Sequence, residues 1–273
     1  MSNQLEATDF PSSSPRGRVR PREDGPRGQA SEQGERYDRQ RLPLAMRLAR
    51  KLRFPVNRFL ASQSRVGTAP FFEPSDIPGI RALSENWEAI RDEAAAVLAD
   101  RARVPALGKV SPDHRGIAPT SSWKSFFFTG YGYQAKANRA RCPKTAALLD
   151  SIPDLVVGFY SIFEPGTHVK AHKGVTSGLI NIHLPLSVPA RDLGRCELRV
   201  EQDYRSWTPG HLLVFDETYE HEAWNQTSEP RLVLLIQVLR PMHLPGRMIG
   251  RFFLWCIKRT SFVQDIRRNI GAE

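Results

Sequence analysis

The chain has 273 residues, of which 40% are hydrophobic, and its mean hydropathy is −0.41, so it can hold one large domain or two small ones with a proper core. Its three cysteines, Cys142, Cys196 and Cys256, lie far apart and form no CxxC pair, which argues against a disulfide scaffold or a zinc ribbon and fits a reducing compartment. The net charge of +10 comes from the two ends, because residues 1–65 carry 14 Lys and Arg against 7 Asp and Glu, and residues 240–273 carry 7 against 2.

The amino-terminal region divides into two segments. Residues 1–40 are rich in Pro, Gly, Ser and Arg and nearly free of aliphatic residues, so we expect them to be disordered. They contain no apolar signal core, so secretion is not expected. Residues 41–65 are predicted to be a basic amphipathic helix and linker, because Leu44, Leu48 and Leu52 recur every four residues beside basic side chains. This leucine stripe fits docking on the domain and attachment to an anionic membrane surface equally well.

Residues 66–240 are predicted to form the main domain, with helices first and strands after them. Residues 75–104 have helical spacing of apolar residues, with a Ser or Asn available as a cap, and a shorter helix is expected over 143–151, starting at Pro143. Short β-rich runs then follow without helices between them, which predicts an antiparallel sandwich or barrel, mainly β with flanking helices (α+β). These runs are 154–164, 179–188, 196–201, 211–216, 221–225 and 231–240.

The run "LINIHLPLSV" alternates between apolar and polar residues. Asn181 and His183 share one face, and the other face carries only aliphatic side chains. Such alternation usually places the apolar face inward, so we expect Asn181 and His183 to face solvent. A small barrel that binds a polar ligand would show the reverse arrangement.

Two histidines and one arginine are candidates for chemistry. His172, in "KAHKGVTSG", and His221, in "FDETYEHEAWN", are 49 residues apart, and imidazole is a preferred ligand of divalent iron. Taken singly, each is more often structural than a ligand. Arg231 opens the apolar run "RLVLLIQVL", where a buried guanidinium would cost several kcal/mol unless an anion pairs with it. A dicarboxylate is a natural anion for such a site, although Arg231 could instead face solvent or pair with an acid near Glu229.

Six stretches resemble one known family. They are "ENWEAIRDEA", "WKSFFFTGYG", "CPKTAALLDSIPDL", "EPGTHVKAHKG", "SWTPGHLLVFDETYEHEAWN" and "PRLVLLIQVLRP", and in this order they are spread along residues 71–265, the span of the resemblance. The resemblance is to the aspartyl/asparaginyl β-hydroxylases, a family of Fe(II)- and 2-oxoglutarate-dependent dioxygenases that includes lipid A hydroxylase-like members. It implies a double-stranded β-helix core (jelly roll, cupin-like), with Fe(II), 2-oxoglutarate and O2 as cofactor and cosubstrates.

The resemblance also assigns the iron site. The iron-binding histidines of the family fall on His172 and His221, and the carboxylate that many related oxygenases carry two residues after the first histidine falls on Gly174. The absence of that carboxylate is itself a family trait. Two aromatic residues, Trp207 and Trp224, could line the site, but we expect both to belong to the core.

The 2-oxoglutarate residues follow in the same way. The far carboxylate of 2-oxoglutarate is anchored in the family by residues that fall on Arg231 and Ser161, and the near carboxylate by a histidine that falls on His183. An arginine that also meets the near carboxylate is replaced here by Asn181. This departure removes one positive charge from the implied cosubstrate site.

The implied reaction is hydroxylation of an unactivated C–H bond in an Asp or Asn side chain or in a lipid A-type acyl chain.

Residues 241–273 form a predicted basic amphipathic tail, whose apolar core at 252–257 fits an interfacial helix or a helix packed onto the domain. We therefore expect a cytoplasmic protein, peripheral at the inner face of the cytoplasmic membrane if the tail binds lipid. No nucleic-acid partner is expected, because no aromatic residue interleaves the arginines of residues 11–35.

Two other functions remain open from the sequence. A 2-oxoglutarate-dependent halogenase would use the space beside Gly174 for chloride bound to iron. A catalytically inactive jelly-roll binding protein would have lost its site, with Asn181 as the first sign of decay.

Overall fold

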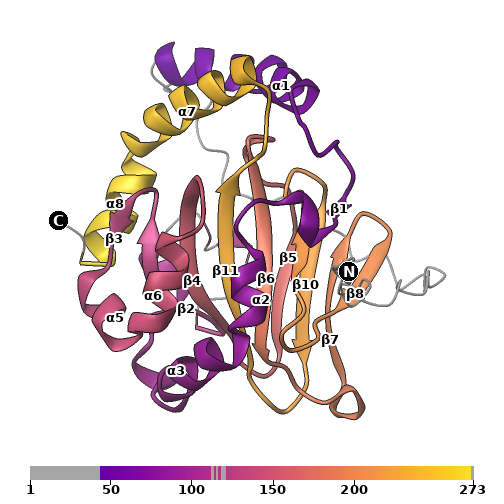
Figure 1. The fold of residues 1–273 in the computed structure, drawn as a ribbon, viewed down its shortest axis with the longest axis vertical. Helices are drawn as coiled ribbons and strands as arrows, with labels where there is room; N and C mark the ends of the chain where they lie inside the picture. The colour runs from indigo at the N-terminus through magenta and orange to yellow at the C-terminus, as the bar shows by residue number, and fades with distance from the viewer. Residues whose placement is uncertain (1–43, 112–113, 115, 118–120, 272–273) are drawn as a thin grey trace, which may run out of the picture.

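The computed structural model describes residues 44–111, 114, 116–117 and 121–271 (Figure 1), and of residues 44–52 it describes only the backbone. The predicted disorder of residues 1–40 and the leucine stripe of the first helix therefore lie outside the described residues. The division of the chain at residues 40, 65 and 240 stays a prediction. Among the described helices, none is both long and apolar enough to cross a membrane.

Two antiparallel sheets form the centre of the molecule. The larger sheet has the order β1-β9-β6-β11-β4-β2-β3, and the smaller one has the order β5-β10-β7-β8. The strands are β1 Phe71–Phe72, β2 Trp123–Gly130, β3 Tyr133–Gln134, β4 Leu155–Phe163, β5 Thr167–His172, β6 Leu179–Ser187, β7 Arg195–Val200, β8 Asp203–Ser206, β9 Leu213–Phe215, β10 His221–Gln226 and β11 Arg231–Leu239.

From β4 onward the chain winds back and forth between the sheets. β4, β6, β9 and β11 belong to the larger sheet, while β5, β7, β8 and β10 belong to the smaller one. This alternation is the double-stranded β-helix, or jelly roll, and it confirms the predicted fold class. Its consequence for function is that residues far apart in the sequence come to lie on neighbouring strands.

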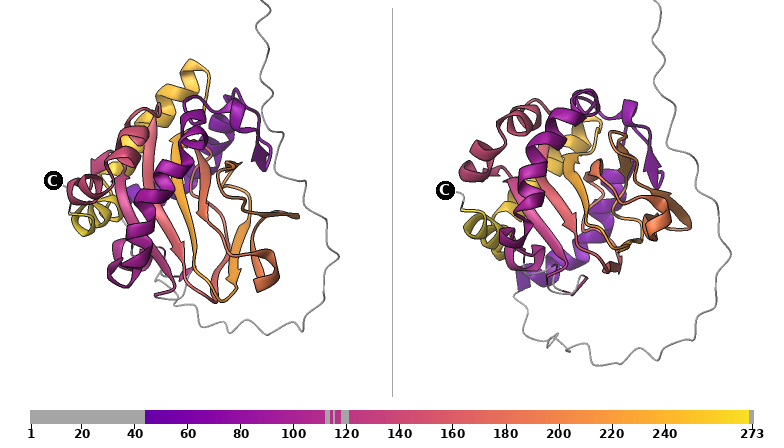
Figure 2. Two further views of the ribbon diagram at one scale, coloured as in Figure 1. Left: turned by 60° about the horizontal axis from the view of Figure 1, so that its bottom comes forward. Right: turned by 90° about the horizontal axis from the view of Figure 1, so that it is seen from below.

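Helices cover the outer face of the larger sheet and one end of the molecule (Figures 1 and 2). The predicted helix over 75–104 has the right place but is broken near Asn86, whose side-chain amide donates to the carbonyl of Ala82 instead of capping the next helix. The predicted helix at 143–151 is confirmed with Pro143 in its first turn. The α-helices are α1 Leu44–Ser62, α2 Arg81–Glu85, α3 Trp87–Ala99, α4 Leu107–Val110, α5 Lys136–Arg141, α6 Pro143–Asp150, α7 Leu244–Lys258 and α8 Ser261–Asn269, with 3-10 turns at Pro74–Asp76, Arg101–Arg103 and Arg191–Leu193.

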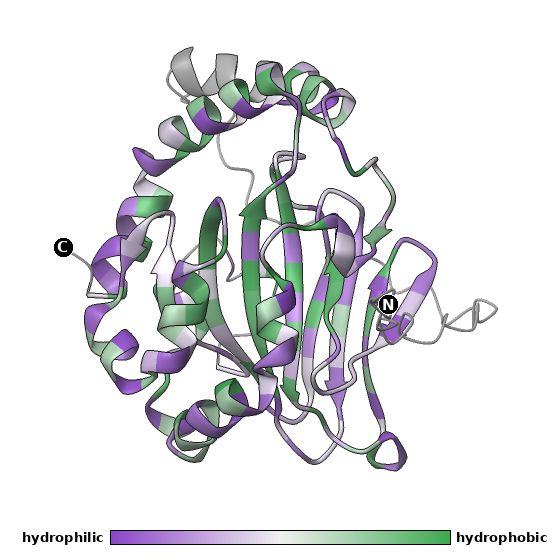
Figure 3. Cartoon of the chain, in the orientation of Figure 1, coloured by the Kyte–Doolittle hydropathy of each residue, from purple (hydrophilic) through white to green (hydrophobic). Residues whose placement is uncertain are grey.

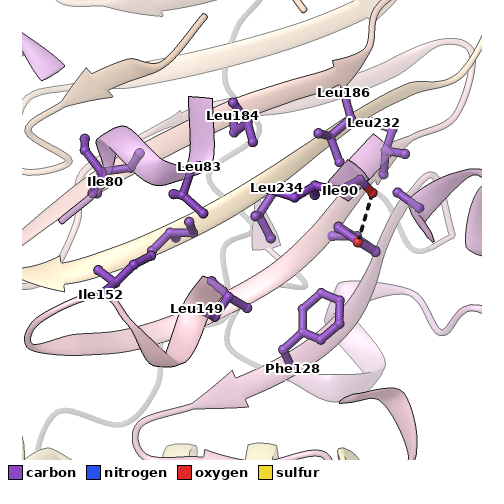
Figure 4. Close-up of a cluster of buried hydrophobic side chains, with 14 of the residues drawn as sticks. Ile80, Leu83, Ile90, Phe128, Leu149, Ile152, Leu184, Leu186, Leu232 and Leu234 are labelled. Carbon is purple, nitrogen blue, oxygen red and sulfur yellow. Dashed lines mark hydrogen bonds between the residues drawn. The ribbon is translucent and has the colours of Figure 1, made fainter. Parts of the chain in front are cut away.

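The apolar face of β6 points toward these helices. Leu184 and Leu186 meet Ile90 of α3 in a buried cluster that also contains Leu83 and Leu234 (Figure 4). Hydrophobic residues recur along β4, β11 and β6 for the same reason (Figure 3). Burial of this area is the main favourable contribution to the stability of the fold.

The polar face of β6 therefore lies inside the barrel. Asn181 and His183 are each only 6% exposed. The expectation that they face solvent is wrong, because the helices already cover the opposite face of the sheet. A buried polar face inside a small barrel is the arrangement of a site for a polar ligand.

Candidate active site

His172 and His221 stand opposite each other on neighbouring strands. They are direct partners in the register of β5 and β10, and the centroids of their rings are 4.1 Å apart. The two histidines are 49 residues apart in the sequence, but they are neighbours in space because the winding of the jelly roll places β10 beside β5. The structure thus brings together the two histidines that the resemblance singled out.

Backbone hydrogen bonds fix the tautomer of both rings. Nδ1–H of His172 donates to the carbonyl of Lys170 at 2.7 Å, and Nδ1–H of His221 donates to the carbonyl of Tyr219 at 3.0 Å. Burial, followed by the charge of His172, lowers the pKa of His221 to about 4, and burial also lowers the pKa of His172. Both imidazoles are therefore neutral at pH 7, and each keeps an unprotonated Nε2 that can act as a ligand.

Arg231 is buried as a cation without a matching anion. It is 1% exposed, and among the described residues its Nε and Nη1 atoms have no hydrogen-bond partner. Its guanidinium carbon lies 3.6 Å from the centroid of the Phe163 ring and 4.3 Å from that of Trp207. Burial lowers the pKa of Arg231 to about 9, so it stays mostly protonated at pH 7. The alternatives of a solvent-facing arginine and of a pair with an acid near Glu229 are both wrong.

Ser161 and His183 lie in the same interior. Ser161 is fully buried on β4 and accepts a hydrogen bond of 2.9 Å from the indole N–H of Trp123. His183 accepts one of 3.1 Å at Nδ1 from the indole N–H of Trp207, which leaves its Nε2–H as a donor. Burial and the charge of Arg231 lower the pKa of His183 well below its usual value, so this ring is also neutral.

The two tryptophans have different roles. Trp207 is buried, and it contacts both His183 and Arg231, so it lines the site as well as belonging to the core. Trp224 packs on the opposite face of the smaller sheet, where it stacks on His168 at 5.5 Å between centroids and lies under the guanidinium of Arg195. Trp224 therefore takes no part in the site.

Glu217 is a site residue that sequence reasoning missed. Its Oε2 accepts hydrogen bonds from Asn181 Nδ2 at 3.0 Å and from Gln237 Nε2 at 2.7 Å. Burial and the nearby Asp216 raise the pKa of the Glu217 carboxyl to about 7. The signal that could have revealed it was an acid four residues before His221, in the loop that leads into a candidate ligand strand.

The same side chain fills the space beside Gly174. A Cβ atom added at Gly174 would come within 2.7 Å of Glu217 Oε1 and closer still to its carbon atoms. The expectation that glycine leaves an open space here is therefore wrong. Among the described residues, no group of three or more His, Cys, Asp or Glu side chains is placed to share a metal ion.

Comparison with known proteins places the chain in a family. The family model described as aspartyl/asparaginyl beta-hydroxylase matches residues 84–241. An ornithine lipid ester-linked acyl 2-hydroxylase of Rhizobium tropici is 33% identical over 202 residues, which are 74% of this chain and 72% of that protein. The aspartyl/asparaginyl beta-hydroxylase of Homo sapiens is 32% identical over 172 residues, which are 61% of this chain but only 22% of the human protein.

Among solved structures, a prolyl-4-hydroxylase of Pseudomonas putida is similar at a TM-score of 0.38 and 14% identity, over 70% of this chain and 100% of that one. Since the two sequence relatives are both hydroxylases by name, the comparison supports an enzymatic role. The length and identity of the matches show that this chain belongs to the aspartyl/asparaginyl β-hydroxylase family.

Proposed function

We propose that this protein is an Fe(II)- and 2-oxoglutarate-dependent dioxygenase that hydroxylates an unactivated C–H bond. The observation that carries the proposal is the coexistence, in one jelly-roll interior, of two facing neutral imidazoles and a buried arginine whose Nε and Nη1 have no partner among the described residues. His172 and His221 would hold the iron. When bound with 2-oxoglutarate and O2, the iron supplies the oxidising chemistry that converts C–H to C–OH.

The donor set of the site fits such a metal. Two imidazoles with free Nε2 atoms are suitable ligands for Fe(II), and their Nδ1–H bonds to backbone carbonyls hold the rings in place. Two protein ligands leave several positions for a chelating cosubstrate and water. Glu217 is held by Asn181 and Gln237 at the edge of this region, and it would bind water or another donor there rather than leave the position empty.

Arg231 would bind the far carboxylate of 2-oxoglutarate. Its Nε and Nη1 atoms have no partner among the described residues and could donate to a carboxylate, and the hydroxyl of Ser161 lies on the neighbouring strand. The Nε2–H of His183 would meet the near carboxylate. Because Asn181 is engaged with Glu217 and carries no charge, Arg231 would supply a larger share of the attraction for the dianion.

We infer that the substrate carbon belongs to a lipid acyl chain, and the lipid hydroxylase of Rhizobium tropici supports this choice, because it matches along 72% of its own length. An Asp or Asn side chain is the second candidate, supported by the human relative. We place the activity in the cytoplasm, at the inner face of the cytoplasmic membrane, and the excess of basic residues at both ends of the chain supports that placement.

The two alternatives from the sequence are less well supported. A halogenase needs room for chloride beside Gly174, but the carboxyl of Glu217 occupies that room and would repel an anion when ionised. A decayed binding protein would have no reason to keep a buried cation without an anion, because such a group is costly to a fold that makes no use of it.

The test is succinate formation from 2-oxoglutarate by the purified protein with Fe(II), ascorbate, O2 and either bacterial lipid extract or Asp- and Asn-containing peptides. We expect succinate together with a product that has gained one oxygen atom. His172→Ala and His221→Ala should abolish both. His168→Ala is the matched control, because His168 lies on the same strand as His172 but on the outer face of the sheet, where it pairs with Glu222. Unchanged turnover in either of the first two variants would contradict the proposal.

A further inference from the structure

Helix α7 exposes a row of large apolar side chains. Leu244, Met248, Phe252 and Trp255 are spaced by four, four and three residues, so they share one side of the helix, here called the outer row. Their exposed fractions are 69%, 64%, 64% and 51%. Single exposed hydrophobic residues are ordinary, but a continuous row along a helix indicates a surface that is normally covered.

The fold does not need this row. The inner side of α7 is already packed, because Gly246 and Gly250 are buried against α1 and the end of β11. A Cβ atom at Gly246 would overlap the side chain of Gln63, and one at Gly250 would come within 3.0 Å of the Met242 side chain. The helix thus has two apolar sides, of which the inner one holds it to the domain. From the sequence, the tail could be a helix packed onto the domain or an interfacial helix. Helix α7 has one side suited to each of these roles.

Basic residues border the outer row. Helix α7 contains no acidic residue, and Arg247, Arg251 and Lys258 follow one edge of the row by their spacing of four and seven. Arg247 and Arg251 lie 3.6 and 2.6 Å from the carboxylate of Asp154, so two arginines share one acid. At the other end Arg259 lies over the Trp255 ring at 3.4 Å. The surface combines apolar contact area with net positive charge.

Two further features fit a lipid surface. Phe252 and Trp255 stack with ring centroids 5.7 Å apart, and tryptophan, whose indole N–H gives it a polar edge, is favoured at the boundary between water and hydrocarbon. At the start of α7 a cavity of about 360 Å³ is lined by Arg65, Met242, His243, Leu244 and Arg247. Its two guanidinium groups fit the phosphate of a lipid headgroup.

The outer row lies at the same end of the molecule as the loop that follows His172. Helix α1 runs beside α7 across this end (Figure 1), and its residues Arg53 and Asn57 donate hydrogen bonds of 3.0–3.1 Å to the carbonyls of Gly174 and Val175. This loop follows His172 directly. Val175 in this loop and Phe54 on α1 are also exposed apolar side chains, at 55% and 79%.

We propose that the outer row of α7, with its basic edge, docks on the surface of a bilayer that contains anionic phospholipid. A bilayer is favoured over a protein partner because the row is convex, uniformly apolar and bordered only by cations within its own helix, which are the features of an interfacial helix. The docking rests on the membrane placement in the proposed function, but its test is separate from catalysis, because binding to vesicles needs neither iron nor cosubstrate.

The test is flotation of the full chain with vesicles of phosphatidylcholine alone and of phosphatidylcholine mixed with phosphatidylglycerol. The wild-type chain should float with the mixed vesicles, more weakly at high salt, and little with phosphatidylcholine alone. The double variant Phe252→Ser, Trp255→Ser should lose about tenfold or more in vesicle affinity, because two exposed aromatic rings are no longer transferred from water to the bilayer. Arg65→Glu should weaken binding only to the mixed vesicles.

Leu193→Ser is the matched control, because Leu193 is another exposed large apolar residue, in the 3-10 turn at Arg191–Leu193. It should bind like the wild-type chain, and so should His172→Ala, which separates docking from catalysis. Equal circular dichroism and melting temperature would show that the double variant folds. Failure of the wild-type chain to bind mixed vesicles, or equal binding by the double variant, would overturn the proposal. A wild-type dimer that becomes monomeric in the double variant, without vesicle binding, would also overturn it in favour of a second copy as the occupant.

Discussion

At the scale of single residues, the site combines polar groups that have protein partners, such as Ser161 and His183, with one buried cation, Arg231. Arg231 is held between the rings of Phe163 and Trp207, which compensate part of the cost of burying its charge but leave its Nε and Nη1 atoms without a hydrogen-bond partner among the described residues. It lies on the barrel side of β11 because Leu232 and Leu234 pack in the cluster beneath the covering helices, and side chains alternate along a strand. The desolvation of such a cation costs free energy, and the binding of an anionic ligand would recover part of that cost.

Replacement of this arginine should separate stability from binding. Arg231→Met should raise the free energy of unfolding of the ligand-free protein by roughly 1–3 kcal/mol, because it removes a buried cation without an anion. It should also raise the KM for 2-oxoglutarate by about a hundredfold or more, because a buried charge pair with the ligand is lost. Urea unfolding and succinate assays measure the two effects, and Arg195→Met, on the outer face of the smaller sheet, should leave the KM unchanged. An unaltered KM in Arg231→Met would place the carboxylate anchor elsewhere.

Glu217 should make stability depend on pH in a defined direction. Its pKa is about 7 in the folded protein against an ordinary 4.5, so the penalty for its buried charge is absent below about pH 4.5 and complete above pH 7. Glu217→Gln should therefore stabilise the chelator-treated protein little at pH 5 and by roughly 2–3 kcal/mol at pH 8. Urea unfolding at both values checks this. A gain that is the same at pH 5 and pH 8 would show that Glu217 is not the titrating group.

At the scale of elements, α1 serves as a clamp on the loop that follows His172. The side chain of Asn57 both donates to the carbonyl of Val175 and accepts from the N–H of Ser177, at 3.0 and 3.1 Å. Arg53 adds two bonds to the same loop. The position of the loop, and hence of the end of β5, thus depends on a helix more than a hundred residues earlier in the chain.

Loss of this clamp should loosen the loop more than the fold. Asn57→Ala removes two hydrogen bonds and should cost about 1–3 kcal/mol, concentrated in the loop. Hydrogen exchange of the amides of residues 175–178 should accelerate, while those of β4 and β11 stay protected. Ser62→Ala, which loses only a bond within α1, is the control. Equal exchange in the loops of both variants would contradict the role of α1.

The sequence predicted the later strands better than the earlier ones. β6, β10 and β11 stand out because they are alternating or strongly apolar runs between turns. β2 and β5 were not predicted as separate strands: β5, "THVKAH", has polar residues on both faces, and its only large aliphatic side chain is Val169. The orientation of β6 was predicted wrongly because alternation shows which residues share a face of the strand, but not which of the two faces the helices cover.

At the scale of the whole molecule, the resemblance anticipated the pairing of His172 with His221 and the inward direction of Arg231. It could not anticipate the carboxyl of Glu217 beside Gly174 or the contact of Trp207 with His183, because both depend on how loops pack inside the barrel. Nor could a periodic pattern reveal that α7 has two apolar sides, since one is recognised only by its exposure.

The site and the outer row of α7 make one arrangement. The clamp by α1 places the loop after His172 next to the surface that we propose to meet the bilayer. On the proposed function, an acyl chain held in that bilayer would approach the proposed iron site from this side of the molecule. This geometry would favour a lipid over a soluble peptide as the substrate.

The measurement that tests the central claim most directly is an anaerobic titration of the purified protein with Fe(II) and 2-oxoglutarate, followed by visible absorption. If His172, His221 and Arg231 form one site, the wild-type chain develops the metal-to-ligand charge-transfer band of chelated 2-oxoglutarate, with one equivalent of iron per chain. His172→Ala and His221→Ala develop little or none of it, and Arg231→Met requires far more 2-oxoglutarate. Absence of the band in the wild-type chain, or an equal band in the histidine variants, would contradict the account.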